Sequence, residues 1–153
     1  MAACMDYIMN QYHEIIEDTE KKNNIISAIS GVFFFTGWWF IIDITARYGP
    51  ADFSNFYHIC GILGTISFII INSISTKNIE MYRYGIGSYA AWIWLFLGFV
   101  LGFGSLIASI WILFGAYILP GINIIPGLGV FAQNLFIFIG SLIFKFGRKE
   151  DLM

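Results

Sequence analysis

Four long apolar stretches, separated by short polar segments, divide the amino-acid sequence. They cover residues 25–46, 57–76, 88–119 and 127–146. A bilayer core about 30 Å thick is crossed by a helix of about 20 apolar residues, so each stretch is long enough to span it. Because every backbone polar group in lipid must be bonded within the protein, apolar runs of this length predict helices. The pattern therefore predicts an all-α protein, a four-helix polytopic membrane bundle.

The segment before the first predicted span has a different pattern. Between residues 5 and 20, apolar side chains recur every three or four positions, and acidic and amide side chains fill the opposite side. We expect a short amphipathic helix within a cytoplasmic tail of residues 1–24, followed by a transmembrane domain of residues 25–153. This helix could lie on the membrane surface, dock on the protein's own spans or bind a partner. Its acidic polar side argues against attraction to anionic lipids.

The basic residues predict how the spans are oriented. In a four-span arrangement, Arg47 lies on one side of the membrane, and all the other Lys and Arg residues lie on the opposite side. Cytoplasmic loops retain Lys and Arg, so this asymmetry predicts that both termini are cytoplasmic. Three or five spans would scatter the basic residues over both sides. The residues on the predicted cytoplasmic side are Lys21, Lys22, Lys77, Arg83, Lys145, Arg148 and Lys149.

The overall composition agrees with a membrane protein. Of the 153 residues, 58% are hydrophobic and 12% are charged, whereas soluble domains carry about 25% charged residues. A soluble fold of this size has no interior large enough for so much apolar surface. The net charge of −2 provides no basic field for phosphates, which excludes a nucleic-acid partner. The lipid bilayer is therefore the first partner that the sequence predicts.

Asp43 is the most notable ionisable residue, because it lies just within the outer boundary of the first predicted span. Arg47 follows four residues later, so a continuing helix places both side chains on one face. One interpretation is an ion pair that ends the span at the interface. The alternative is that Asp43 binds a proton or an ion, since acidic residues inside membranes are often functional. A transport path of that kind would need further polar groups at mid-depth.

Few polar side chains lie near the middle of the predicted spans. Amides and hydroxyls in lipid usually form hydrogen bonds between helices, and each contributes about 0.6–2 kcal/mol. We therefore expect these side chains to hold the helices together, with a polar cavity for a small ligand as the alternative. They are Asn72 on the second span, Ser105 and Ser109 on the third, and Gln133 and Asn134 on the fourth.

Small residues recur at intervals of four on the third span, and such faces let helix backbones approach closely. One interpretation is packing within the chain, because four helices can satisfy one another. The span also carries more than one small face, which favours docking of another membrane protein as the alternative. The pairs are Gly98 with Gly102, Gly104 with Ala108, and Ser105 with Ser109.

No set of residues for catalysis or cofactor binding can be assembled from one side of the membrane. His13 and His58 are isolated from other side chains at metal-binding spacing. The sequence contains no Ser-His-Asp, Cys-His or paired-carboxylate arrangement, and its glycines form no phosphate-binding loop. The sequence therefore predicts a protein that is not an enzyme and binds neither a metal nor a cofactor.

Several segments resemble the transmembrane protein 50 family, also called uncharacterised protein family 0220. The resemblance extends from about Lys21 to Leu152 and includes parts of all four predicted spans. The segments that carry it are residues 34–43 (FFTGWWFIID), 57–61 (YHICG), 71–75 (INSIS), 94–96 (WLF), 103–117 (FGSLIASIWILFGAY), 126–128 (PGL), 133–134 (QN) and 145–148 (KFGR).

This resemblance implies a four-span protein of endoplasmic reticulum, Golgi and late-endosomal membranes. A fungal member of the family belongs to the vacuolar protein sorting set and acts with a small four-span protein similar to the leptin-receptor-overlapping-transcript proteins. We therefore expect a non-enzymatic subunit or adaptor in membrane traffic, with a partner of that kind. One alternative is a small transporter, channel or channel accessory subunit that uses Asp43 and the mid-span amides. Another is a lipid-handling protein, suggested by the aromatic content of 19%.

Overall fold

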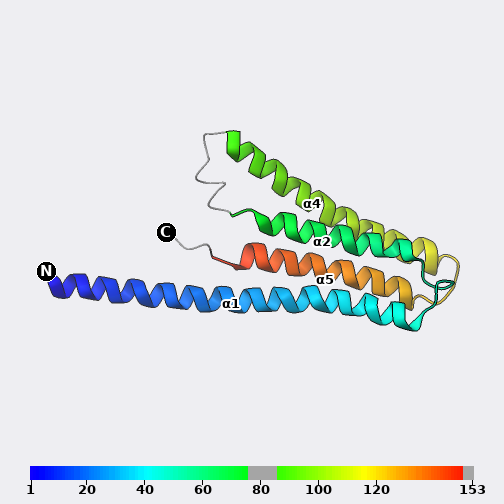
Figure 1. Cartoon of the computed structure of the whole chain (residues 1–153), viewed down its shortest axis with the longest axis horizontal. Coiled ribbons are helices and arrows are strands. Elements are labelled where there is room, and N and C mark those ends of the chain that lie inside the picture. Colours follow the sequence, from blue (N-terminus) through cyan, green and yellow to red (C-terminus); the bar gives the residue numbers. More distant parts are fainter. Residues whose placement is uncertain (76–85, 150–153) are drawn as a thin grey trace.

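The computed structural model describes residues 1–75 and 86–149, which form helices and connecting turns without strands. Four long helices lie side by side in one elongated bundle (Figure 1). They are α1 (Ala2–Arg47), α2 (His58–Ser73), α4 (Ile86–Ile112) and α5 (Ile125–Gly147). A short 3-10 helix, Asn55–Tyr57, precedes α2, and a six-residue π-helix, Leu113–Ile118, continues α4.

Each of the four helices is long and apolar enough to cross a membrane, which confirms the predicted all-α, four-span architecture. The apolar segments are Ala3–Arg47, Asn55–Ser73, Tyr89–Ile118 and Ile125–Gly147. Each segment begins and ends within a few residues of the predicted span, except that the first segment begins much earlier than residue 25. The chain is therefore an integral membrane protein.

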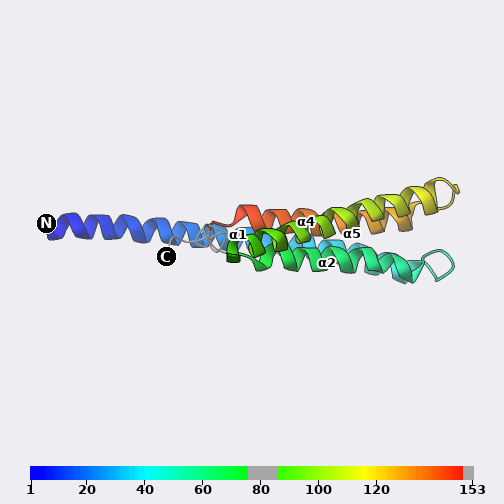
Figure 2. The same cartoon turned by 90° about the horizontal axis from the view of Figure 1, so that it is seen from above.

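The first helix is much longer than its membrane span. The predicted amphipathic helix over residues 5–20 is helical, and it continues without a break into the first span. The first glycine of the chain is Gly31 and the first proline is Pro50, so neither of the strongest helix breakers interrupts the junction at residue 24. As a result, the N-terminal half of α1 extends straight beyond the other helices (Figures 1 and 2).

The helices pack as two pairs joined through α2 and α5. The most extensive contact is between α1 and α5, the first and last helices, followed by that between α2 and α4. Contacts between α2 and α5 join the pairs, so α1 and α4 lie on the outer sides (Figure 1). One apolar cluster at the end near the 49–54 turn contains Ile41, Ile44, Phe53, Cys60 and Val130.

The connection between α4 and α5 is a tight turn. The π-helical segment ends in two backbone hydrogen bonds, from Leu119 N–H to the Phe114 carbonyl at 2.9 Å and from Ile122 N–H to the Tyr117 carbonyl at 3.2 Å. Gly121 follows with a φ of +70°, a conformation that glycine adopts without a steric penalty. The third span therefore ends close to Pro120, as the sequence predicts.

The start of α1 and the end of α5 lie at the same end of the bundle (Figure 1). Asn23 on α1 holds the backbone that follows α5: its Nδ2 donates to the Lys149 carbonyl at 2.6 Å, and its Oδ1 accepts from Lys149 N–H at 2.9 Å. Lys21, Lys22, Lys145, Arg148 and Lys149 gather here, and Arg47 lies at the opposite end. Lys77 and Arg83 lie outside the described residues.

Candidate functional site

Gly98 and Gly102 on α4 allow very close approach of the chain's own helices. A β-carbon at Gly98 would lie 2.8 Å from side-chain atoms of both Ile70 and Ile71 on α2. A β-carbon at Gly102 would lie 2.6 Å from the hydroxyl of Ser67, also on α2. Both glycines are buried. This pair therefore faces α2, as packing within the chain requires.

Gly104 lies on a different side of α4 and is exposed. A β-carbon at Gly104 would meet no other atom within 4 Å. Ala108, which was predicted to share its face, is half-buried and packs against the cluster that contains Ile41 and Val130. Of this predicted pair, only Gly104 is thus fully available on the outer surface of the bundle.

The hydroxyls of Ser105 and Ser109 are directed into the bundle, but they bond to their own helix. Ser105 Oγ donates to the Gly102 carbonyl at 2.9 Å, and Ser109 Oγ donates to the Leu106 carbonyl at 2.6 Å. A serine in a helix readily reaches the carbonyl three or four residues earlier. The predicted bonds between helices are therefore replaced by local ones at these two positions.

Two other serines do bridge helices. Ser67 Oγ on α2 donates to the Gly98 carbonyl on α4 at 2.7 Å. Ser30 Oγ on α1 donates to the Gly140 carbonyl on α5, also at 2.7 Å. No local pattern in the sequence marks Ser30 for this role. In both cases a serine meets a glycine of the neighbouring helix, but this signal is usable only when the neighbouring helices are known.

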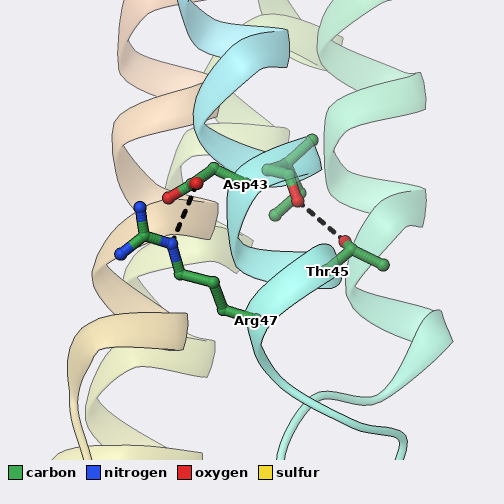
Figure 3. Close-up of polar contacts among 4 residues, drawn as sticks. Asp43, Thr45 and Arg47 are labelled. Atoms are coloured by element: carbon green, nitrogen blue, oxygen red, sulfur yellow. Dashed lines mark hydrogen bonds and ion pairs between the residues drawn. The ribbon is translucent and has the colours of Figure 1, made fainter.

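Asp43 and Arg47 form the ion pair that their spacing predicts (Figure 3). Arg47 Nε donates to Asp43 Oδ1 at 2.9 Å, and the two side chains are 71% and 42% exposed, respectively. Thr45, between them, bonds its hydroxyl to the Ile41 carbonyl at 2.7 Å. The pair lies at the end of α1, on the surface of the bundle. It is thus positioned to end the span and does not face the mid-depth amides.

Asn72 links α2 to α5 weakly. Its Nδ2 donates to the Phe68 carbonyl in its own helix at 2.8 Å and lies 3.4 Å from Ser141 Oγ on α5. Its Oδ1 is buried and has no hydrogen-bond partner among the protein groups. Asn72 therefore makes the predicted bridge between helices, while its acceptor atom remains unsatisfied.

Gln133 and Asn134 form a buried polar layer on α5. Gln133 is 0% exposed, and neither polar atom of its side-chain amide has a protein partner. Asn134 Nδ2 donates to the Val130 carbonyl in its own helix at 2.9 Å, but its Oδ1 is unpartnered. An unpaired buried polar group costs about 1–3 kcal/mol. The polar layer therefore contains three of the four buried side-chain polar atoms without a partner in the described residues, and Asn72 Oδ1 is the fourth.

Glycines on the two neighbouring helices α1 and α2 lie close to Gln133 and Asn134. A β-carbon at Gly61 on α2 would lie 2.3 Å from Gln133 Nε2, and one at Gly37 on α1 would lie 2.9 Å from the Gln133 backbone oxygen. A β-carbon at Gly64 would lie 3.0 Å from Asn134 Oδ1. Glycines thus let α1, α2 and α5 meet around this layer, and the Gln133 amide directly contacts the α2 backbone.

The projecting half of α1 carries its own ion pair. Lys21 Nζ lies 2.8 Å from Glu17 Oε1, and both side chains are largely exposed. Their hydrogen bond and opposite charges lower the pKa of Glu17 and raise the pKa of Lys21. This spacing of four residues stabilises an exposed helix modestly. The pair therefore supports the helix outside the membrane bundle.

The histidines and cysteines lie in separate environments. The ring of His58 packs edge-on against Phe53, with centroids 5.3 Å apart. Cys60 is buried in the apolar cluster, and Cys4 is exposed near the start of α1. Within residues 1–75 and 86–149, no three His, Cys, Asp or Glu side chains are close enough together to hold a metal ion.

These features define a small polytopic membrane protein whose polar interior is used largely for helix packing. The chain belongs to the Uncharacterised protein family (UPF0220), whose model matches residues 4–152. It is similar to the Transmembrane protein 50 homolog of Dictyostelium discoideum, with 28% identity over 143 residues. The match covers 82% of this chain and 92% of that relative. No solved structure matches the chain.

Proposed function

We propose that the protein is a non-enzymatic subunit or adaptor of a membrane-protein complex in traffic between endoplasmic reticulum, Golgi and late endosome. The observation that carries this proposal is the half of α1 that stands clear of the bundle. Its Met5, Ile8 and Ile15 side chains are 66%, 60% and 63% exposed outside any predicted span. Apolar side chains grouped on a soluble surface are typical of interaction sites.

Inside the membrane, the outer face of α4 is the proposed contact for a small polytopic partner. Gly104 leaves space for another helix backbone to approach, as small residues at membrane interfaces do. The family resemblance supports a partner similar to the leptin-receptor-overlapping-transcript proteins and the named compartments. The gathering of basic residues at one end of the bundle supports cytoplasmic termini.

The test is purification of the tagged chain from its native membranes in a mild detergent. We expect a membrane partner to be recovered in stoichiometric amount. Gly104→Ile should release it, whereas Gly31→Ile should retain it, because Gly31 lies on α1, away from the proposed contact, and a β-carbon at either glycine meets no atom within 4 Å. Recovery of a lone, fully stable monomer would overturn the proposal.

A small transporter or channel is the second candidate, favoured by the unpaired amide atoms of Asn72, Gln133 and Asn134. Two observations argue against it. The Gln133 amide packs against Gly61 on α2, where a β-carbon would lie 2.3 Å from Nε2. The cavity of about 230 Å³ beside Arg47 is lined by residues of the 45–55 region and by no mid-depth amide. Ion or proton flux in liposomes that falls on Asp43→Asn would support the transporter instead.

A further inference from the structure

A single stripe of side chains runs along one side of α1, at steps of three or four residues. The half of the stripe nearer the C-terminal end of α1 is covered by α5. A β-carbon at Gly147 would lie 2.8 Å from Ile26, and one at Gly129 would lie 2.6 Å from Ile44. Between these contacts, Ser30 bonds to Gly140. The stripe therefore marks the side of α1 on which α5 lies.

The same stripe continues toward the N-terminus of α1, beyond the C-terminal end of α5, where nothing in the described residues covers it. Asn23, bonded to Lys149, marks the boundary. From Asn23 toward the N-terminus, the same three- and four-residue steps lead to Thr19, Ile15, Tyr12, Ile8 and Met5. We call the last four of these the free stripe. All four are exposed, and they lie on the side of α1 that faces the space beyond the C-terminal end of α5.

The helix segment that carries the free stripe is rich in carboxylates, and basic residues begin only at Lys21, which pairs with Glu17. Residues 6–20 contain Asp6, Glu14, Glu17, Asp18 and Glu20, and neither Lys nor Arg. These carboxylates lie on the sides and back of the helix, and the free stripe provides an apolar face between them. A ligand that complements both features combines an apolar face with basic flanks.

We propose that the free stripe binds an amphipathic helix with Lys or Arg flanks. A partner protein contributes this helix, which lies along α1 in line with α5 and beyond its C-terminal end. This proposal rests on the proposed role as a complex subunit and specifies the chemistry of its partner. The free stripe, from Met5 to Ile15, is about 15 Å long, which accommodates about three helical turns. Packing of an apolar helix face against such a stripe is a common mode of recognition.

A second copy in the same membrane does not fit this site. The free stripe lies on the side of α1 that α5 occupies within the bundle, so a parallel copy of α1 would run into α5 at the level of Ile26. A copy approaching from an opposing membrane would bring two acidic helices together, which is unfavourable. The partner is therefore a different chain.

The membrane surface does not fit either. The helix is continuous from Ala2 to Arg47, and lying flat would require a break that no glycine or proline before Gly31 provides. The anionic surface of a cytoplasmic leaflet also repels the acidic side chains. The free stripe thus remains away from lipid and open to protein.

The test uses the full chain in nanodiscs of uncharged phosphatidylcholine and a fluorescent synthetic peptide of about 16 residues, with Leu on one face and Lys on its flanks. We expect anisotropy to show saturable binding that weakens as NaCl rises from about 50 to about 500 mM. Tyr12→Asp should weaken binding about tenfold or more. The matched control is Tyr7→Asp, since Tyr7 is also exposed on the same helix, at 65% against 49% for Tyr12, but lies off the stripe.

Several outcomes would overturn this proposal. These are equal binding to empty nanodiscs, equal binding by a scrambled peptide or a peptide with Glu in place of Lys, and equal weakening by Tyr7→Asp and Tyr12→Asp. Self-association of the chain that Tyr12→Asp abolishes would assign the stripe to a second copy instead. Peptide binding without recovery of any native membrane partner would retain this inference while the proposed function fails. If a native partner is recovered in the same amount with Tyr12→Asp and the peptide does not bind, the proposed function stands and this inference is overturned.

Discussion

The hydroxyl of Ser67 on α2 donates to the backbone carbonyl of Gly98 on α4 at 2.7 Å. Replacing Ser67 by Ala removes this bond, so we expect the free energy of unfolding to fall by about 0.6–2 kcal/mol. Unfolding in mixed detergent micelles measures the change. Ser105→Ala is the control, because the Ser105 hydroxyl bonds within its own helix. Equal losses for both variants would contradict a bridging role for Ser67.

Gly98 should tolerate no larger side chain. In Gly98→Ala, the new methyl group meets branched side chains of Ile70 and Ile71 and the α2 backbone, so we expect a loss of about 1–3 kcal/mol. Gly104→Ala on the same helix meets no atom within 4 Å and should leave stability unchanged or raise it by up to about 1 kcal/mol. A thermal unfolding series in one detergent compares them, and similar melting temperatures would refute the assigned orientation of α4.

Gln133 should be replaceable by an apolar residue of similar shape. Gln133→Met removes two unpartnered polar atoms from a buried site, so we expect stability to increase by about 1–3 kcal/mol. Gln133→Ala, in contrast, leaves a cavity and should be destabilising. If Gln133→Met were also destabilising, the amide would have a partner that the protein itself does not supply, which would strengthen the transporter alternative.

The ion pair of Asp43 and Arg47 should contribute little. Both side chains are substantially exposed, so Asp43→Asn and Arg47→Gln should each change the free energy of unfolding by about 1 kcal/mol or less. The double variant should resemble either single variant. A much larger loss in Asp43→Asn alone would mean that the carboxylate has a further role at the membrane interface.

Both chain ends should be accessible from the cytoplasm. We expect tags at Met1 and after the final residue to be digested by protease in sealed vesicles whose cytoplasmic face is outward. A tag inserted after Pro50 should be protected. The start of α1 and the end of α5 lie at the end of the bundle that carries most of the described basic residues, and the turn after α1 that contains Pro50 lies at the opposite end. Accessibility of the Pro50 tag alone would reverse the proposed orientation.

The elements and one contact were predictable because their signals are local in the sequence. The four apolar stretches gave the spans, and a spacing of four residues gave the pair of Asp43 and Arg47. The pairing of α1 with α5 joins residues more than one hundred positions apart, such as Ser30 and Gly140, and no local pattern marks it. For the same reason, the sequence does not reveal that Gly98 faces inward while Gly104 faces outward.

The unbroken junction in α1 was missed for a different reason. Lys21 and Lys22 mark a membrane boundary, and a boundary of polarity is easily taken for the end of a helix. The two residues at the junction, Asn23 and Asn24, lower helix propensity by at most about 0.7 kcal/mol each, which is too little to break a long helix. The environment of the chain changes at this point, but its backbone conformation does not.

The pairing of the first helix with the last also has a consequence for biosynthesis. The ribosome releases the α1 segment long before the residues of α5 have been synthesised, so the side of α1 that bears Ser30 and Ile44 enters the membrane without its eventual neighbour. The insertion machinery or lipid must shield it during that interval. Completion of the fold therefore depends on α5, and truncation before Ile125 leaves the first span without its main neighbour.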